Sequence, residues 1–451
     1  MAAISAGRFL ADGGLRNIPS MHADPAAPTA ASSPTVPAAL RIDADRLWRR
    51  LHDLAAFTEP DQPWTRRAFS VSFQRGRHWL RQQFEAAGLQ TRMDSAGNLI
   101  GRLEGSVPGL PPLATGSHSD TVPHGGRFDG VLGVLAGLEA VQSIRESGLR
   151  LRHPLEVIDF LGEEPSDHGV SCIGSRACAG HLDAGMLALR DGAGESLAAA
   201  MARIGARPGE LGPALRPPGS LAAFVELHIE QGPVLEARQL PIGVVTNIVG
   251  IRRYTVTVAG RADHAGTTPM HLRQDALVGA AEVIAQAQRL AASHGDGPPY
   301  VVATVGRLAL TPNAANSVPG HVSMTLEVRS DAPAVLDGFV HAVMAASAEA
   351  LTRLRVTADV ALLTRTEPVA CDPRVMAAIE AAAARLQLGS MRLPSGAGHD
   401  AMHLAEAGPV GMVFVPCRDG RSHCPEEWIE PDQAAAGTAV LAQALVALDG
   451  A

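Results

Sequence analysis

The order of apolar patterns along the chain constrains its fold more than any single motif does. Between residues 38 and 246, helical spacing of apolar residues alternates with short apolar runs typical of buried strands. The same alternation resumes after Asp372 and continues to the C-terminus. Such alternation favours an α/β domain with a mostly parallel, mixed sheet flanked by helices. We therefore expect one α/β domain built from residues 38–246 and 363–451.

The middle of the chain, residues 247–362, follows a different pattern. Residues 253–258 alternate between apolar and polar side chains, as a half-exposed strand does. The elements expected next are a helix at 272–293, strands at 301–310 and 322–328, a helix at 335–354 and a strand at 356–363. This order is that of a ferredoxin-like α+β unit, a small sheet with helices on one face. The sequence thus predicts one domain inserted into another.

Composition argues against several classes of function. The net charge of −8, without a basic run, disfavours a nucleic-acid or anionic membrane partner, and no run of 18 apolar residues offers a membrane span. The five cysteines form no Cys-x-x-Cys pair, and their odd number fits a reducing, cytoplasmic compartment. The chain contains no lysine and no Gly-x-Ser-x-Gly sequence, so the usual covalent routes of catalysis are poorly supplied.

The first 37 residues differ from the rest of the chain. They are rich in Ala, Pro and Ser and lack periodicity, which predicts a disordered tail. The apolar stretch from Ile4 to Leu10 is too short for a secretory signal, and Met21 is an alternative start.

Histidine and carboxylate side chains gather at the ends of the expected strands. An apolar run at 113–115 leads to His118, and Asp129 follows in a glycine-flanked loop, an arrangement suited to a metal site. Four further segments carry such residues: Glu163-Glu164, 226–232, 263–267 and 422–426. The carboxyl ends of strands in an α/β sheet converge on one edge, where sites form.

Five of these side chains would form a shell for two divalent ions that share one carboxylate: His118, Asp129, Glu164, His228 and His423. Imidazole and carboxylate suit zinc, and also manganese, cobalt or nickel. Two ions about 3.5–4 Å apart can activate water and polarise a carbonyl group together.

Each segment also has a plainer explanation when it is taken alone. A His-x-Asp sequence is usually part of a surface loop, and Glu163-Glu164 is usually a solvated turn. His264 would be a capping residue, and Arg329 a surface charge at a strand end. The remaining histidines considered, His124, His168, His271 and His399, are expected to be structural or solvated. Glu426 is expected to support the loop that carries His423.

Four motifs occur along the chain: Gly-Ser-His-x-Asp at 116–120, Glu-Leu-His-Ile-Glu-Gln-Gly at 226–232, His-Ala-Gly-Thr-Thr-Pro-Met at 264–270 and Ser-Gly-Ala-Gly-His-Asp at 395–400. In this order they resemble the metal-dependent aminoacylase/carboxypeptidase clan of hydrolases. More narrowly, they resemble its hydantoinase/carbamoylase branch of N-carbamoyl-L-amino-acid hydrolases, ureidopropionases and allantoate amidohydrolases. The resemblance covers residue 40 to the C-terminus, including the insertion.

The resemblance implies a role for each candidate metal ligand. His118, Asp129 and His228 would hold one ion, and Asp129, Glu164 and His423 the other, so that Asp129 bridges. The cofactor would be two divalent metal ions, zinc or manganese, cobalt or nickel.

The resemblance also implies the roles of the reacting groups. Asp120 would orient His118. Glu163 would act as general base on water and then as proton donor to the leaving nitrogen. His264, on the inserted domain, would stabilise the oxyanion, reaching in from the partner subunit of a homodimer formed through that lid domain. The substrate-binding residues would be Gln231, Asn316, Arg329 and the backbone of Gly396 and Gly398, with Arg253 a weaker candidate.

One segment departs from the branch. After the paired glutamates, the branch commonly has a small residue and then an Arg-Phe pair, whereas this chain has Pro165-Ser166-Asp167-His168-Gly169. The substrate pocket is therefore expected to differ from that of a standard carbamoylase.

The resemblance implies a small-molecule carboxylate as substrate. The expected reaction cleaves the carbamoyl C–N bond of an N-carbamoyl-L-amino acid, with allantoate or 3-ureidopropionate as rival substrates. A peptidase or aminoacylase is disfavoured by Gln231 and Arg329. A non-catalytic binding protein is disfavoured by the intact Glu163 and the complete set of ligands.

Overall fold

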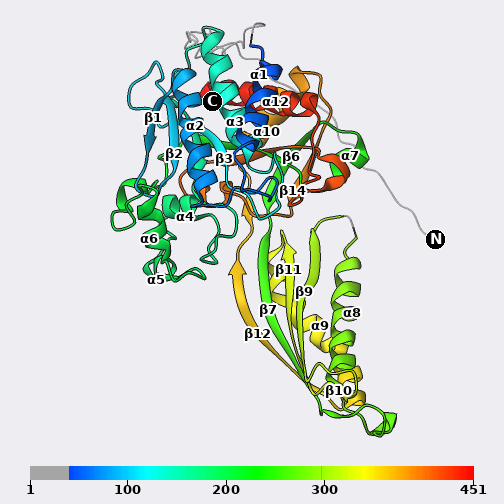
Figure 1. The fold of residues 1–451 in the computed structure, drawn as a ribbon. Helices are drawn as coiled ribbons and strands as arrows, with labels where there is room; N and C mark the ends of the chain where they lie inside the picture. The colour runs from blue at the N-terminus through cyan, green and yellow to red at the C-terminus, as the bar shows by residue number, and fades with distance from the viewer. Residues whose placement is uncertain (1–39, 296, 451) are drawn as a thin grey trace, which may run out of the picture.

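The computed structural model describes residues 40–295 and 297–450, which form a large lobe and an elongated small lobe (Figure 1). The predicted disordered tail and the alternative start at Met21 lie outside the described residues. The chain enters the small lobe between β6, which ends at Ile248, and β7, which begins at Gly250. It returns between β12, which ends at Thr366, and β13, which begins at Val369.

The large lobe is built on a nine-stranded sheet with the order β1-β2-β4-β3-β5-β15-β6-β13, and β14 also pairs with β6. Its strands are β1 (Gln90–Met93), β2 (Leu99–Leu103), β3 (Leu113–His118), β4 (Leu155–Phe160), β5 (Ala223–Ile229), β6 (Ile242–Ile248), β13 (Val369–Ala370), β14 (Ser390–Ser395) and β15 (Val410–Val415). The central strands β4, β3, β5 and β15 run parallel, whereas β1 and β2 pair antiparallel with their neighbours. Strand β6 pairs antiparallel with β15 and β13 and parallel with β14. The predicted mixed, mostly parallel sheet is confirmed.

The central strands are buried along their whole length, which explains their high content of apolar residues. Every residue of β3, β4, β5 and β15 is buried, as expected for parallel strands covered on both faces. The flanking helices are α1 (Ala44–Ala55), α2 (Val71–Ala86), α3 (Val131–Glu146), α4 (Ile173–Ala179), α10 (Pro373–Arg385), α11 (Ala401–Leu404) and α12 (Pro431–Asp449). Gly133 lets α3 approach the sheet closely, because a Cβ there would lie 2.3 Å from the carbonyl oxygen of Leu227.

The small lobe is the predicted ferredoxin-like unit. Its elements are β7 (Gly250–Ala259), β8 (Asp263–His264), α8 (Ala276–Ala292), β9 (Val301–Thr311), β10 (Ser317–Val318), β11 (His321–Ser330), α9 (Pro333–Leu354) and β12 (Thr357–Thr366). The four long strands form an antiparallel sheet in the order β12-β7-β11-β9, and α8 and α9 cover one of its faces (Figure 1). This arrangement confirms the expected α+β insertion.

Within the described part of the chain, one helix, α9, is long and apolar enough to cross a membrane by length and composition alone. Its buried residues include Leu336, Phe339, Val340 and Val343, which belong to the core of the small lobe. This spacing is that of an amphipathic helix packed on a sheet. The absence of a membrane partner stays a prediction.

Several elements of the large lobe were not expected from the sequence. They are β1, β6, β13 and β14 and the short helices α4, α5 (Ala184–Ala188), α6 (Leu197–Arg203), α7 (Val234–Arg238) and α11. Strand β14 lies beside β6, with only two of its six residues buried, so its sequence carries little apolar signal.

Candidate metal centre

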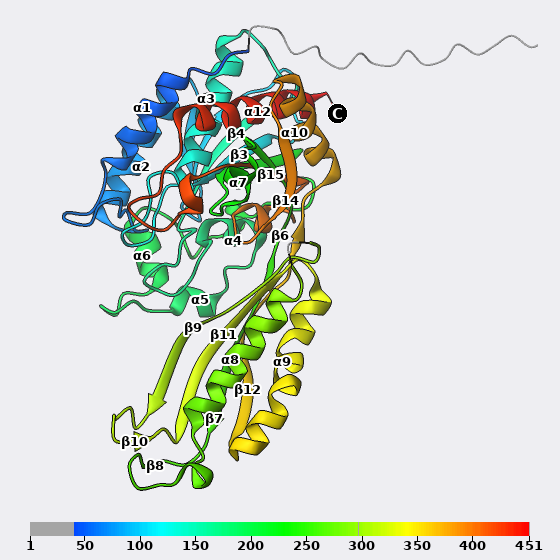
Figure 2. The same cartoon turned by 90° about the vertical axis from the view of Figure 1, so that its right-hand side faces the viewer.

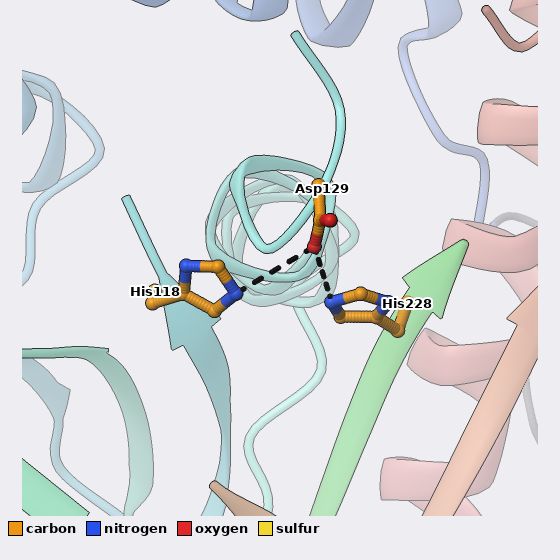
Figure 3. Close-up of side chains that lie close together, drawn as sticks. All are labelled: His118, Asp129 and His228. Carbon is orange, nitrogen blue, oxygen red and sulfur yellow. Dashed lines mark ion pairs between the residues drawn. The ribbon is translucent and has the colours of Figure 1, made fainter. Parts of the chain in front are cut away.

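The candidate ligands meet at the edge of the sheet where β3, β4 and β5 end. His118 is the last residue of β3, and His228 is the last but one of β5. Asp129 lies in the loop just before α3, and Glu164 follows β4 after a turn at Gly162, whose φ is 60°. The side chains of His118, Asp129 and His228 come from three separate elements and point toward one another (Figure 3).

Asp129 is the centre of this cluster. Its Oδ1 lies 3.1 Å from Nε2 of His228 and 3.7 Å from Nε2 of His118. Its Oδ2 lies 3.0 Å from Nε2 of His423, which is 3.3 Å from Oε1 of Glu164. The ligand atoms therefore form two groups that share Asp129, one at each carboxylate oxygen.

Main-chain contacts fix which nitrogen each buried histidine presents. Nδ1 of His118 lies 3.0 Å from the carbonyl oxygen of Asp120, and Nδ1 of His228 lies 2.8 Å from that of Ile229. With Nδ1–H donated to these carbonyls, each ring turns Nε2 toward Asp129 as the nitrogen that can bind a cation, and Nε2 of His228 also lies 3.2 Å from the backbone N–H of Gly130.

Asp120 has a second contact. Its Oδ1 is 3.7 Å from Nδ1 of His118, and its two oxygens accept the backbone N–H groups of Glu163 (3.3 Å) and Glu164 (3.2 Å). The residue therefore contacts both the histidine loop and the glutamate loop.

The electrostatics of the cluster favour a positive charge between the ligands. Burial alone would raise the pKa of the Asp129 carboxyl, but hydrogen bonds from His228 and His423 outweigh burial and hold that pKa well below its ordinary value. Hydrogen bonds to Asp129 and Glu164 raise the pKa of His423 to about 11. A site that stabilises an imidazolium so strongly also fits a metal cation, and the imidazole and carboxylate donors suit divalent transition ions.

Glu163 lies beside this cluster. Its Oε2 is 3.6 Å from Nε2 of His118, and the thiol of Cys172 donates to its Oε1 at 3.4 Å. Burial, with the negative charges of Glu164, Asp400 and Asp120, raises the pKa of Glu163 well above its ordinary value. A carboxyl group with a raised pKa can both accept and return a proton near neutral pH.

Two residues of the site hold strained backbone conformations. Gln231 has a φ of 56° and His423 a φ of 57°, both in the left-handed region. Gln231 donates from Nε2 to Oδ2 of Asp129 at 2.8 Å, and its Oε1 is buried without a partner among the described residues. Strain of this kind concentrates at functional sites, and the free amide oxygen is a possible acceptor for a ligand.

Arg329 and Arg253 lie at the end of the small lobe that adjoins the large lobe. Arg329 donates from Nη1 to the carbonyl oxygen of Gly396 at 2.8 Å and from Nε to Oε1 of Glu327 at 2.7 Å. Arg253 forms an ion pair with the same Glu327. Gly398 belongs to the same loop as Gly396, between β14 and α11. These candidate substrate residues therefore come together where the lobes meet.

His264 and Asn316 lie at the opposite end of the small lobe. His264 pairs with Ser317 across β8 and β10, and the N–H of Ala265 donates to the carbonyl oxygen of Asn316 at 2.9 Å. Figure 2 places β8 and β10 at the tip that points away from the large lobe. Within one chain, these two residues do not reach the metal cluster.

Three further residues of the cluster were missed or misplaced. Burial raises the pKa of Glu427 to about 7, and its carboxyl group accepts the N–H groups of Phe128 and Asp129, whereas Glu426 only pairs with Arg421 at the surface. The loop support expected of Glu426 thus belongs to its neighbour. Cys172, whose thiol contacts Glu163, was not among the candidate residues.

His399 is also part of this region. Its ring lies 4.5 Å from the ring of His228, burial keeps its pKa well below the ordinary value, and Nε2 contacts Oγ of Ser395 at 2.8 Å. With Glu226 and His228 it forms a third possible ligand group. The oxygens of Glu226 already accept hydrogen bonds from Oγ of Ser117 (2.7 Å) and the N–H of Ala401 (3.0 Å), so this carboxylate has partners without a metal ion.

Comparison with known proteins places this centre in a class of enzymes. The chain belongs to peptidase family M20/M25/M40, whose profile matches residues 114–447. It is 43% identical to an N-carbamoyl-L-amino-acid amidohydrolase of Paenarthrobacter aurescens over 91% of this chain and 99% of that one. It is 35% identical to an allantoate amidohydrolase of Bacillus subtilis, over 82% of this chain and 89% of that one.

The fold leads to the same branch. A crystal structure of an amidase of the hydantoinase/carbamoylase family from Burkholderia multivorans superposes with a TM-score of 0.83 at 36% identity, covering 91% of this chain and 99% of the other. The resemblance to this branch is confirmed. So is the prediction of a metal-dependent hydrolase for carbon–nitrogen bonds other than peptide bonds.

Proposed function

We propose that the chain is a dinuclear amidohydrolase that cleaves the carbamoyl C–N bond of N-carbamoyl-L-amino acids, with the amino acid, ammonia and carbon dioxide as products. The observation that carries this proposal is the position of Asp129, which offers one oxygen to each of two ligand groups, next to the buried Glu163. His118, Asp129 and His228 would hold one ion, and Asp129, Glu164 and His423 the other, with zinc, manganese, cobalt or nickel as the candidates.

The chain's own residues supply the proton transfers. When bound, a pair of divalent ions at such a centre activates water and polarises the carbonyl group that is attacked. Glu163 accepts the proton of the attacking water and returns it to the leaving nitrogen, a role that its raised pKa supports. Asp120 keeps Glu163 in place through the N–H group of that residue.

Arg329 is proposed to bind the carboxylate of the substrate, with Gln231 and the backbone of Gly396 and Gly398 lining the pocket and Asn316 of the partner subunit completing it. A guanidinium group pairs with a carboxylate through two parallel hydrogen bonds. Arg253 shares Glu327 with Arg329 and supports its orientation.

His264 is proposed to stabilise the oxyanion from the partner subunit of a homodimer formed through the small lobe. The distant position of the tip supports this arrangement, because a tip that cannot reach its own metal cluster can serve a neighbouring one.

The five free cysteines support a reducing, cytoplasmic compartment.

Allantoate is the second candidate substrate, and 3-ureidopropionate a third. The similarity to an allantoate amidohydrolase favours the former. The loop at 165–169 is proposed to influence the choice among these substrates, because it follows Glu164 directly. It is held by an ion pair between Asp167 and Arg67 at 2.5 Å and by the packing of His168 on Phe69.

A substrate panel tests the proposal. Metal-free protein is reconstituted with zinc, manganese, cobalt or nickel and assayed for ammonia release from N-carbamoyl-L-amino acids, their D-enantiomers, allantoate and 3-ureidopropionate. We expect the L-carbamoyl compounds to be the best substrates and chelation to abolish activity. Full activity in metal-free protein would refute the metal centre, and a clear preference for allantoate would replace the proposed substrate.

A further inference from the structure

The loop that carries His423 is the least protected part of the metal centre. The side chain of His423 is 48% exposed, whereas those of His118 and His228 are 2% and 1% exposed. His423 comes from the loop between β15 and α12, while the two other histidines belong to buried strands. Because loops are more mobile than the strands of a core, other groups must hold His423 in register with Asp129.

Glu427 makes this connection. Its Oε1 accepts the backbone N–H groups of Phe128 at 2.8 Å and of Asp129 at 3.1 Å. Its Oε2 lies 2.8 Å from Oγ of Ser422, and that Oγ lies 2.7 Å from Oδ2 of Asp129. One fully buried carboxyl group therefore contacts the main chain of one metal ligand and the residue that precedes another.

The surroundings leave little freedom for any other arrangement. A Cβ at Gly126 would lie 1.9 Å from Oε1 of Glu427, so only glycine leaves room for this carboxyl group. The hydroxyl group of Ser422 has one proton, which can be donated to only one of its two carboxyl neighbours. When Ser422 donates its proton to Asp129, the contact between Oε2 of Glu427 and Oγ of Ser422 needs a second proton, which the Glu427 carboxyl group must donate.

We infer that Glu427 is a positioning residue of the metal centre, which holds the His423 loop against the Asp129 loop so that these two ligands can share a cation. It does not touch the substrate. The inference rests on the proposed metal centre but not on the identity of the substrate, so its test measures metal binding.

The experiment compares the cation affinity of variants prepared metal-free, by competition with a chromophoric chelator for zinc and for manganese. Glu427→Ala removes all three contacts, and we expect an affinity about 10- to 100-fold weaker, the usual cost of losing an outer partner of a metal ligand. Glu427→Gln keeps the acceptor for the two N–H groups and gives Ser422 a donor, so we expect an affinity within about threefold of the unaltered protein.

Asp449 offers a matched control. Its buried carboxylate also accepts two backbone N–H groups from a distant segment, those of Arg152 (2.9 Å) and His153 (2.8 Å). These residues precede β4, at the end of that strand opposite to Glu163 and Glu164. We expect Asp449→Ala to lower the melting temperature of the metal-free protein and to leave the cation affinity and the metal-induced rise in melting temperature unchanged.

Ser422→Ala guards against a Glu427→Ala chain that fails to fold. It removes only the hydroxyl bridge, and we expect about a three- to tenfold loss of cation affinity, the usual cost of one hydrogen bond. Unchanged affinity in Glu427→Ala or Ser422→Ala, or an equal loss in Asp449→Ala, would overturn the inference. A cation affinity of Glu427→Gln as weak as that of Glu427→Ala would also overturn it, because the metal centre would then depend on the charge of Glu427 and not on its hydrogen bonds. Unaltered protein that binds no divalent cation would refute the metal centre itself.

Discussion

The candidate functional residues are gathered at one place in the large lobe but lie at two opposite ends of the small lobe. The five candidate metal ligands of the large lobe form two groups of contacting side chains that share Asp129, although their positions in the chain run from 118 to 423. The four candidate substrate residues of the small lobe separate into two pairs, Arg253 and Arg329 at one end and His264 and Asn316 at the other. The metal centre is thus complete within one chain, whereas the proposed substrate site is not.

Sheet geometry explains the difference. Parallel strands bring their carboxyl ends to the same edge, so residues that follow β3, β4 and β5 meet without further help. The antiparallel strands of the small lobe run the length of the lobe. Strand β11 alone, His321–Ser330, spans roughly 30 Å at the usual rise per residue. Residues at its two ends can meet only if a second chain brings its tip to the first.

The largest effect is expected inside the large lobe. Glu163→Gln removes the proton acceptor but keeps the size of the side chain and leaves Glu164 to bind metal. We expect kcat to fall by about 10²–10⁴, with metal content unchanged by elemental analysis. Glu164→Gln is the matched control and should lose metal. Loss of metal from the first variant and not from the second would mean that the roles of the two glutamates are exchanged.

A mixed dimer tests whether the small lobe completes the site of its neighbour. Glu163→Gln and His264→Ala chains with different affinity tags are coexpressed, and the heterodimer is purified. If His264 acts across the interface, one of its two sites contains both intact residues, and we expect about half the activity of the unaltered dimer. Each homodimer should be nearly inactive. A heterodimer as weak as its parents would show that His264 acts within its own chain, contrary to the proposed arrangement.

Arg329→Lys tests the end of the small lobe that adjoins the large lobe. The change keeps the charge but loses the two-pronged pairing with a carboxylate. We expect kcat/KM on carboxylate substrates to fall about 10- to 100-fold, since a hydrogen bond to a charged group contributes roughly 1.5–3 kcal/mol. Arg253→Lys, which alters the partner of the same Glu327, should lose less. Equal losses on a substrate that lacks the carboxylate would mean that Arg329 only supports the contact with Gly396.

The sequence carried the information for the parts that are set by periodicity. Short runs rich in apolar residues indicated β3, β4, β5 and β15, and the order of strands and helices indicated the insertion. Strand β14 was missed because only two of its six residues are buried. No periodicity indicates which of two adjacent glutamates faces inward, so the buried contacts of Glu427 could not be separated from the surface pair of Glu426.

The sequence was enough to predict the metal ligands but not the positions of the functional residues in the small lobe. The types and order of His118, Asp129, His228 and His423 indicated a metal centre, but the division of the small-lobe residues between its two ends depends on strand length and direction. A motif near His264 identifies a functional residue without indicating which chain it serves.

The last prediction compares a buried histidine of the large lobe with an exposed histidine of the small lobe, and it concerns stability and not activity. His403 in the large lobe is buried with Nε2 unpaired among the described residues, and burial, with the charges of Arg176 and His181, lowers its pKa to about 3. His264 at the tip of the small lobe is exposed. Below pH 6.5 His403 is protonated in the unfolded chain but stays neutral in the folded chain. Stability from this residue is therefore complete above pH 6.5 and falls as the pH drops toward 3, by about 1.4 kcal/mol per pH unit within that window.

Replacing this histidine should remove that dependence. We expect the melting temperature of metal-free His403→Gln protein to fall less between pH 7.5 and 5 than that of the unaltered protein, whatever the variant costs at pH 7.5. His264→Gln is the matched control and should keep the full dependence, because His403 is unaltered in that variant. Parallel pH profiles for all three proteins would mean that His403 is protonated within the folded large lobe. The contrast between a rigidly buried large lobe and an exposed tip would then fail at this residue.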